Sequence, residues 1–529
     1  MLVSALSGCT EETAETEERF VLEAALCGRI ASLDPAMNTD SNAESVFYAL
    51  YENLLRLEED AEGNVTAAPG IAKEYKATEK GDGTVEYVFT LRSSARWSDG
   101  TRVRARDFVY AWCRLADPAT DSPNHAALSM VQGYDEVRET GDASRLGVSA
   151  DGDTLFRVTL RAPCAYFLAE TCTAVATMPL RSDAVSKDPE WTSTNDVLSD
   201  GAYQVGVWAR DEYIQLRRND SYYENVKSGP DLLRFRFFSG RDGAWQLYEN
   251  GRADFALYPP AQTEPSGSLP QRSTACVLYN QMSEIFTNAH VRRAFDLTLD
   301  RAAIAAAVGG GARPADALVP PGLIGASAEE DFRASGGTLC AADAEGYDMR
   351  CLDAEGELRN GGYWGGVGFP TVSCIYVSGP ELRAAAAAAA AAWQEKLSVQ
   401  IVTDGLSREE FDRRVQSGDY ELAIDAFDTR TGDALEFFAP FAASGAENPL
   451  HAVNTPFTLL IGVASTSRDP AARAAFLHDA EELLLADTSV SPLYFGAQPY
   501  VLREGLSGLR FDRRGNVYFC DVSRITTEE

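Results

Sequence analysis

Residues 97–114 read WSDGTRVRARDFVYAWCR, and this stretch predicts a turn followed by a helix. The turn falls at Asp99-Gly100, because glycine readily adopts the positive φ that other residues resist. Asp107 then stands where a helix N-cap belongs, and Pro118 marks the end of the element. Between them, apolar side chains recur on one face at helical spacing: Phe108, Ala111, Trp112 and Leu115.

Periodicity predicts several other elements around this block. Residues 85–91 largely alternate apolar and polar side chains, which is typical of a half-buried strand, and residues 20–25 and 154–160 predict further strands. The alanine run 384–392 predicts a helix, because alanine has the highest helix propensity. Residues 286–301 predict a helix that continues past Arg301.

The composition predicts an ordinary globular chain of two or three domains, because 529 residues exceed one typical core. Hydrophobic residues make up 45% and charged residues 24%. No run of about 18 apolar residues predicts a membrane-spanning helix. The formal net charge of −32 would repel a phosphate backbone, so we expect no nucleic acid among the partners.

Motifs of catalysis are missing from the sequence. It contains no Gly-x-Ser-x-Gly nucleophile elbow, no His-Glu-x-x-His zinc pair and no phosphate-binding loop ending in Gly-Lys-Ser/Thr. The four histidines are too scattered for a local metal motif. We therefore expect a protein that is not an enzyme and that uses no metal and no cofactor. A cell-surface hydrolase with two carboxylates is the alternative.

The block at 97–114 closely resembles the signature of the extracellular solute-binding proteins (family 5) that serve peptide and oligopeptide ABC importers. Further landmarks of this family occur in its usual order, from Leu33-Asp34-Pro35 to Gly201-Ala202-Tyr203 and beyond, so the resemblance covers about residues 20–525. The residues of the block that match the signature are Trp97, Ser98, Asp99, Gly100, Val103, Ala105, Asp107, Phe108, Val109, Tyr110, Ala111, Trp112 and Arg114.

The resemblance implies an α/β protein with a two-lobed, periplasmic-binding-protein-like fold and a third, smaller domain inserted in the first lobe. On this pattern the second lobe covers 286–498 and the inserted domain covers 53–181. The first lobe combines three stretches of chain: 19–52, 182–285 and 499–529. The signature block then belongs to the inserted domain, so it identifies the family without identifying the ligand.

The segment Phe427 to Asp433 resembles the loop with which this family anchors the α-amino group of a peptide. Aligned without a gap, Phe427 takes the aromatic position and Arg430 falls on the anchoring carboxylate. An arginine there would repel an ammonium group and attract a carboxylate or phosphate. Two alternatives are a shifted loop in which Asp428 anchors the amine, and a surface position for Arg430 without ligand contact.

The same resemblance implies other ligand-binding candidates. A structural role is an alternative for each of them. They are Thr39, Asp40 and Ser41, which follow the Leu33-Asp34-Pro35 motif, Asn124 in the inserted domain, and Tyr494 near a crossing between the lobes.

The N-terminus indicates export and lipid attachment. Residues 6–9, Leu-Ser-Gly-Cys, resemble a bacterial lipobox, so 1–9 is interpreted as a partial lipoprotein signal with lipid on Cys9. The acidic stretch 10–18 has no hydrophobic face and is interpreted as a tether. Because a basic leader is missing, we expect the natural chain to start upstream of Met1. Among the other cysteines, two pairs are close enough for local disulfides, with free thiols as the alternative: Cys164 with Cys172, and Cys340 with Cys351.

Together these features predict a lipid-anchored, monomeric binding protein on the extracytoplasmic face of the bacterial cell membrane. It would capture peptides or a peptide-like solute between its lobes and deliver them to the permease and ATPase subunits of an ABC importer. The lipid anchor would be its contact with the membrane. The alternative is a sensor or adhesion lipoprotein on the same fold, which binds an anionic or non-peptide ligand and has no transport role.

Overall fold

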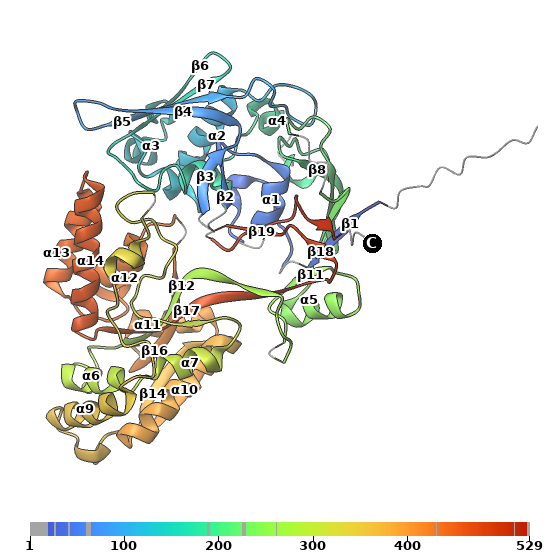
Figure 1. Ribbon diagram of the computed structural model, residues 1–529. Coiled ribbons are helices and arrows are strands. Elements are labelled where there is room, and N and C mark those ends of the chain that lie inside the picture. The colour runs from blue at the N-terminus through green and yellow to red at the C-terminus, as the bar shows by residue number, and fades with distance from the viewer. Residues whose placement is uncertain are drawn as a thin grey trace, which may run out of the picture.

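The computed structural model shows an α/β chain folded into two lobes (Figure 1). The inserted domain and the first lobe form the upper part of this view, and the second lobe forms the lower part and the left side. The structure describes residues 19–25, 28–40, 43–59, 65–187, 191–224, 229–260, 262–328, 330–429, 431–512 and 514–525.

One eleven-stranded mixed sheet extends through both lobes. Strands at one end of it belong to the second lobe and strands at the other end to the first lobe, with β12 and β17 between them. The order across the sheet is β15 (Ile401–Leu406), β14 (Val372–Val377), β16 (Leu422–Asp428), β12 (Gly267–Tyr279), β17 (Val490–Leu502), β11 (Phe255–Leu257), β1 (Val21–Ala25), β10 (Leu232–Arg236), β9 (Tyr213–Arg218) and β8 (Tyr203–Ala209), while β13 (Arg313–Pro314) pairs with β17.

The long strands β12 and β17 connect the lobes and are antiparallel to each other (Figure 1). Their register shifts between Pro270 and Thr274 and again between Ala275 and Cys276. Such irregularities bend a strand and increase its twist. The chain therefore crosses from one lobe to the other on a bent two-stranded ribbon.

The inserted domain has its own antiparallel sheet, so it is a separate layer above the first lobe. Aromatic rings of α2 and of this sheet pack face to edge, as Trp112 does against Phe156 at 5.2 Å between ring centroids. Its elements are β4 (Ala72–Glu79), β5 (Val85–Leu91), β7 (Leu155–Leu160) and β6 (Val148–Asp151), the hairpin β2 (Leu55–Glu59) with β3 (Val65–Pro69), and the helices α2 (Ala105–Ala116) and α3 (Tyr134–Thr140).

Helices cover the sheet in both lobes. Those of the first lobe and its border with the inserted domain are α1 (Glu44–Leu50), α4 (Ser182–Lys187) and α5 (Gly240–Glu249). Those of the second lobe are α6 (Ala289–Leu297), α7 (Arg301–Val308), α8 (Phe332–Gly336), α9 (Tyr347–Asn360), α10 (Pro380–Leu397), α11 (Arg408–Ser417), α12 (Leu435–Ala442), α13 (Thr455–Thr466) and α14 (Pro470–Ala486). The chain ends in short strand pairs, β18 (Leu506–Ser507) with β21 (Ser523–Arg524) and β19 (Arg510–Phe511) with β20 (Val517–Tyr518).

Most of the elements predicted from periodicity are present, but the predicted role of Asp107 as an N-cap is wrong. The helix begins earlier, at Ala105, and Asp107 lies in its first turn. The Asp107 carboxylate accepts hydrogen bonds from the backbone N–H of Arg104 at 2.9 Å and from Trp97 Nε1 at 3.2 Å. Asp107 thus satisfies a helix-end donor from inside the helix, as in a capping box.

The single helix predicted over 286–301 is also wrong, because two helices occupy this stretch. Helix α6 ends at Leu297 and α7 begins at Arg301. Asp300 caps the second helix by accepting a hydrogen bond from the backbone N–H of Ala303 at 2.9 Å. The alanine run does form a helix, α10, whose buried alanines let neighbouring elements approach closely.

The residues of the signature block hold the inserted domain to the first lobe. Arg114 forms two hydrogen bonds with the Asp34 carboxylate, at 3.0 and 2.6 Å. Asp34 is 4% exposed and also caps the short helix that follows it. Trp112 donates from Nε1 to the carbonyl of Thr177 at 2.9 Å. The Arg114–Asp34 pair thus joins the inserted domain to the first lobe, whereas the Trp112–Thr177 bond lies within the inserted domain. None of the residues of the block lines the pockets described below.

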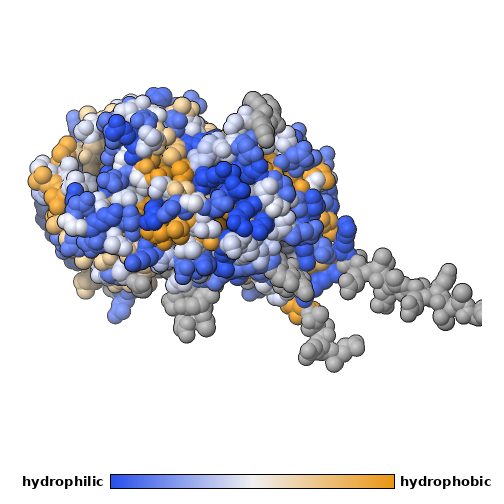
Figure 2. Space-filling view, turned by 90° about the horizontal axis from the view of Figure 1, so that it is seen from above, coloured by the Kyte–Doolittle hydropathy of each residue, from blue (hydrophilic) through white to orange (hydrophobic). Residues whose placement is uncertain are grey.

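The surface seen from above is mainly hydrophilic, with separate small apolar patches (Figure 2). This agrees with the strongly negative net charge of −32. In the described part of the chain, none of the helices is both long and apolar enough to cross a bilayer.

Loss of the Arg114–Asp34 pair should destabilise the protein. Replacing Arg114 with alanine leaves the Asp34 carboxylate buried without its cation, which should lower the free energy of unfolding by about 3 kcal/mol. Urea denaturation measures this difference. Arg106→Ala on the same helix is the control, because that side chain is 70% exposed, and it should change stability by less than about 0.5 kcal/mol. Equal effects of the two substitutions would contradict this prediction.

Candidate functional site

A pocket of about 130 Å³ lies where the first lobe, the inserted domain and the second lobe meet. Asn38 and Glu44 border it from the first lobe, Asn124 from the inserted domain, and Thr431 and Glu436 from the second lobe. Arg514, near the end of the chain, completes its polar lining. We call this space the cleft pocket. Because its walls come from segments hundreds of residues apart, its shape depends on how the lobes are placed.

Asn124 fixes one wall of the cleft pocket. Its side-chain amide donates to the carbonyl of Asn38 at 2.6 Å and to that of Ala36 at 3.3 Å. Ser122 also donates its hydroxyl to the Ala36 carbonyl. The amide of Asn124 therefore holds the chain after the Leu33-Asp34-Pro35 motif in place.

Glu44, at the start of α1, has an unusual electrostatic environment. Burial raises the pKa of its carboxyl to about 7, the nearby Arg514 guanidinium opposes this shift, and Asp512 adds to it. Tyr48 donates its hydroxyl to Glu44 Oε2 at 3.4 Å. Arg514 donates from Nη2 to the hydroxyl of Thr173 at 2.6 Å. At neutral pH, Glu44 can therefore gain or lose a proton inside the cleft pocket.

The second-lobe wall is a loop held by hydroxyl groups. Thr429 and Thr431 donate to the Glu436 carboxylate at 2.7 and 2.6 Å. Next to this loop, Arg272 of β12 forms a doubly hydrogen-bonded ion pair with Glu170 of the inserted domain, at 3.0 and 2.7 Å. Gly432 lies directly against this pair, since a Cβ there would come within 2.6 Å of Glu170 Cδ.

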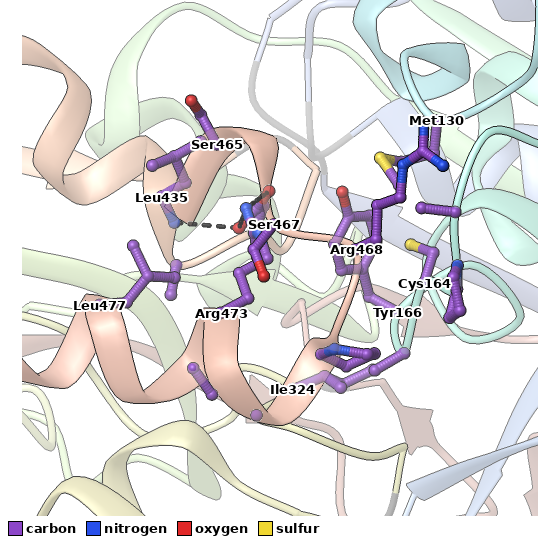
Figure 3. Close-up of a pocket in the computed structure, with 18 of the residues that line it drawn as sticks. Met130, Cys164, Tyr166, Ile324, Leu435, Ser465, Ser467, Arg468, Arg473 and Leu477 are labelled. Atoms are coloured by element: carbon purple, nitrogen blue, oxygen red, sulfur yellow. Dashed lines mark hydrogen bonds and ion pairs between the residues drawn. The ribbon is translucent and has the colours of Figure 1, made fainter. Parts of the chain in front are cut away.

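A second, larger pocket of about 340 Å³ lies between the inserted domain and the second lobe (Figure 3). Cys164 and Tyr166 come from the inserted domain, and Arg468 and Arg473 come from the region of α13 and α14. Asp433 also lines it, and both oxygens of its carboxylate accept from Arg473 Nη2, at 2.9 and 2.8 Å. We call this space the arginine pocket. Asp433, the last residue of the predicted anchoring loop, is thus already paired with a cation.

The predicted ligand-binding residues lie in different places. Asn124 lines the cleft pocket. Thr39 is exposed and Asp40 half-buried in the turn that follows Asn38, beside this pocket and not among its lining residues. The Asp40 carbonyl accepts from the Asn38 amide at 3.1 Å. Ser41 lies outside the described residues.

Of the remaining predicted residues, those that the structure describes do not line either pocket. Phe427 packs against Phe441 at 5.2 Å between ring centroids, on the core of the second lobe. Asp428 is exposed at the end of β16. Tyr494 is 5% exposed within the second-lobe core. Arg430 and the proposed lipidation site Cys9 lie outside the described residues.

Sequence reasoning missed Glu44, Arg514 and Glu436, which border the cleft pocket. No local motif surrounds them, and Glu44 and Arg514 are far apart in the chain. The signal that could have found Glu436 is its position three residues after Asp433, on the first turn of a helix beside the predicted loop.

The cysteines that the structure describes are free thiols, so neither Cys164 with Cys172 nor Cys340 with Cys351 forms a disulfide. Burial raises the pKa of the Cys164 and Cys340 thiols to about 12, so these groups stay protonated and unreactive at neutral pH. Within the described ranges, no group of three or more His, Cys, Asp and Glu side chains is arranged to hold a metal ion.

Two lobes that meet at polar pockets and are joined by two crossing strands define a binding protein of the two-lobed periplasmic class. The family model of the bacterial extracellular solute-binding proteins, family 5, matches residues 66–449. The chain belongs to this family.

Several named proteins are similar over nearly the whole chain. The dipeptide-binding protein DppE of Bacillus subtilis is 25% identical, covering 96% of this chain and 94% of its own length. The oligopeptide-binding protein OppA of the same organism is 27% identical, covering 92% of this chain and 90% of its own length. The probable deoxycholate-binding periplasmic protein YgiS of Escherichia coli is also 27% identical, with 89% and 86% covered.

Solved structures share the fold. The unliganded open form of the periplasmic murein tripeptide binding protein MppA superposes with a TM-score of 0.76 at 23% identity, covering 96% of this chain and 98% of that one. The Haemophilus influenzae OppA complex with the peptide RPPGFSPFR gives a TM-score of 0.72 at 23% identity, covering 96% and 100%. These similarities establish the two-lobed architecture predicted from the sequence.

Glu44 should make the stability of the protein depend on pH. A carboxyl whose pKa is raised on folding contributes stability that is fully present below its unfolded pKa of about 4.5 and is lost as pH rises through about 7. Glu44→Gln removes this loss, so between pH 5 and 8 the variant should gain about 1–2 kcal/mol relative to the wild type. Urea denaturation at several pH values measures the gain. The free energy of unfolding of the exposed Glu409→Gln control should vary with pH as that of the wild type does. If the Glu44→Gln variant also keeps the wild-type pH dependence, the role of Glu44 in that dependence is refuted.

Proposed function

We propose that this protein is the substrate-binding component of an ABC importer and captures peptides, or a peptide-like solute, between its two lobes. The observation that carries this proposal is the cleft pocket, whose walls come from both lobes and the inserted domain and include polar side chains from each of them. A ligand in such a place contacts every part of the molecule at once. Its binding would therefore favour a closed arrangement that a permease can distinguish from the open one.

The names of the relatives support a peptide as the ligand, since two of those described above are named for dipeptide and oligopeptide binding. We propose that the backbone of Thr39 and Asp40, beside the cleft pocket, pairs with the ligand backbone, and that Ser41, which follows them in the sequence, takes part in this pairing. Such pairing is independent of side-chain identity. Arg430 would adjoin the ligand from the second lobe and disfavour a free ammonium group at that point.

The partners in this proposal are the permease and ATPase subunits of the importer. The protein would act as a monomer without catalytic activity, tethered by lipid on Cys9 to the extracytoplasmic face of the bacterial membrane. The boundaries proposed for its parts are those given from the sequence: 53–181 for the inserted domain and 286–498 for the second lobe.

A second candidate is a receptor for an anionic solute that is not a peptide, with or without a transport role. The observation that favours it is the 27% identity with a protein named as probably deoxycholate-binding. Deoxycholate carries a carboxylate and no peptide backbone. Binding of that bile salt in preference to peptides would select this candidate.

Filling the cleft pocket should abolish peptide binding. Ala126 is exposed and lines this pocket, so Ala126→Trp places an indole where the ligand would lie. Protein freed of co-purified ligand is titrated with an equimolar tetrapeptide mixture, and the rise in melting temperature is followed. The wild type should be stabilised because the ligand binds only the native state, and Ala126→Trp should lose this stabilisation.

The matched control is Ala119→Trp, an exposed position of the same domain that lines neither pocket, and it should respond like the wild type. A wild type that shows no shift with any peptide mixture would contradict peptide capture. Equal shifts for both tryptophan variants would move the binding site away from the cleft pocket.

Lipid attachment has a separate test. In bacteria expressing the chain with a complete leader, the wild type should partition with the membrane fraction and Cys9→Ser should be released, because the thioether to the lipid can no longer form. Mass spectrometry of the N-terminal peptide should show acyl chains on Cys9. An unmodified Cys9 in membrane-bound protein would rule out this anchor.

A further inference from the structure

The arginine pocket differs in charge from the protein as a whole. The chain carries a formal net charge of −32, yet three guanidinium groups line this pocket against one carboxylate. The guanidinium groups belong to Arg161, Arg468 and Arg473, and the carboxylate is that of Asp433. A cleft lined by one sign of charge between low-dielectric walls concentrates the electrostatic potential there. An anion that the outer surface repels is therefore attracted at this point.

The Asp433 carboxylate does not cancel the arginines. Both of its oxygens are bound by a single nitrogen, Nη2 of Arg473. Within the described ranges, the hydrogen bonds of the Arg473 side chain are donated from Nη2. That side chain is 21% exposed and lines the pocket. A planar guanidinium can bind one carboxylate on one edge and a second on another.

The two other arginines have partners that a ligand can displace. Arg161 pairs with Asp135 at 3.3 Å, and these side chains are 45% and 74% exposed. Arg468 donates to the backbone carbonyl of Asp82 at 3.3 Å. Exposed contacts of this kind are weak because solvent screens them. Arg161 belongs to the inserted domain and Arg468 to the second lobe, so an anion between them would draw both parts together.

The remaining wall combines hydroxyl side chains, among them Ser129 and Ser465, with apolar ones. Met130 and Tyr166 come from the inserted domain, and Ile324 and Leu477 come from the second lobe (Figure 3). A group that joins a short apolar stem to an anionic head, as the side chain of glutamate does, can contact both the apolar side chains and the arginines.

We propose that the arginine pocket is a subsite that binds a carboxylate of the captured ligand, and that the protein therefore prefers peptides that carry an acidic group. This inference rests on the proposed function and specifies the charge of the ligand. It is independent of Arg430, since the arginines of this pocket belong to other elements. The carboxylate is supplied either by an acidic side chain or by the C-terminus of the peptide.

Isothermal titration calorimetry with three tetrapeptides distinguishes these sources: Ala-Glu-Ala-Ala, Ala-Gln-Ala-Ala, and Ala-Gln-Ala-Ala with an amidated C-terminus. If the side chain occupies the pocket, the glutamate peptide should bind about tenfold more tightly than the glutamine peptide. If the C-terminus occupies it, amidation should cause the tenfold loss instead. In the double variant Arg161→Gln/Arg468→Gln this ratio should fall to near one, while the affinity for the amidated peptide, which carries no carboxylate, stays unchanged.

The matched control is the double variant Arg293→Gln/Arg413→Gln, which removes two exposed arginines of the second lobe and should retain the wild-type ratio. Equal affinity of the wild type for all three peptides would overturn the proposed subsite and leave peptide capture intact. A ratio that survives in the Arg161→Gln/Arg468→Gln variant would overturn it as well. If none of the three peptides binds, the proposed function itself fails, and the subsite fails with it.

Discussion

The ion pair between Arg272 and Glu170 fixes the point at which the parts of this protein meet. Both side chains are about 5% exposed, so the pair carries a large desolvation cost that only good geometry offsets. Two parallel hydrogen bonds provide that geometry. Arg272 lies on the strand that connects the lobes, Glu170 belongs to the inserted domain, and Gly432 of the second lobe leaves room for the carboxylate. One interaction thus positions three parts of the chain.

The bend of the crossing strands explains why this pair can lie where it does. The first register shift of β12 against β17 falls between Pro270 and Thr274, the stretch that contains Arg272. A regular strand would direct successive side chains alternately to its two faces, whereas an irregular one can redirect a side chain. The guanidinium leaves the sheet toward the inserted domain, and the cleft pocket and the arginine pocket form on the second-lobe loop beside it.

The sequence predicted the fold well where local patterns and the family signature agreed, as in the strand, turn and helix around residues 97–114. It failed at the starts of two helices. Asp107 accepts a hydrogen bond from a helix-end N–H while lying within the first turn, and Asp300 caps a second helix in a stretch predicted to be a single helix. The resemblance indicated Asn124, which lines the cleft pocket. It could not reveal Glu44 beside Arg514, because that proximity exists only after two segments far apart in the chain have folded together.

The charges of the two pockets follow from how each carboxylate is paired. In the arginine pocket the carboxylate of Asp433 is bound to a guanidinium, so the other arginines dominate the field. In the cleft pocket Glu44 is buried near both Arg514 and Asp512, and desolvation outweighs the attraction to the cation, which raises the pKa of Glu44. A carboxyl that is partly protonated at neutral pH repels a ligand carboxylate less than a fixed anion does. The two neighbouring pockets therefore both tolerate negative charge, although the surface around them is acidic.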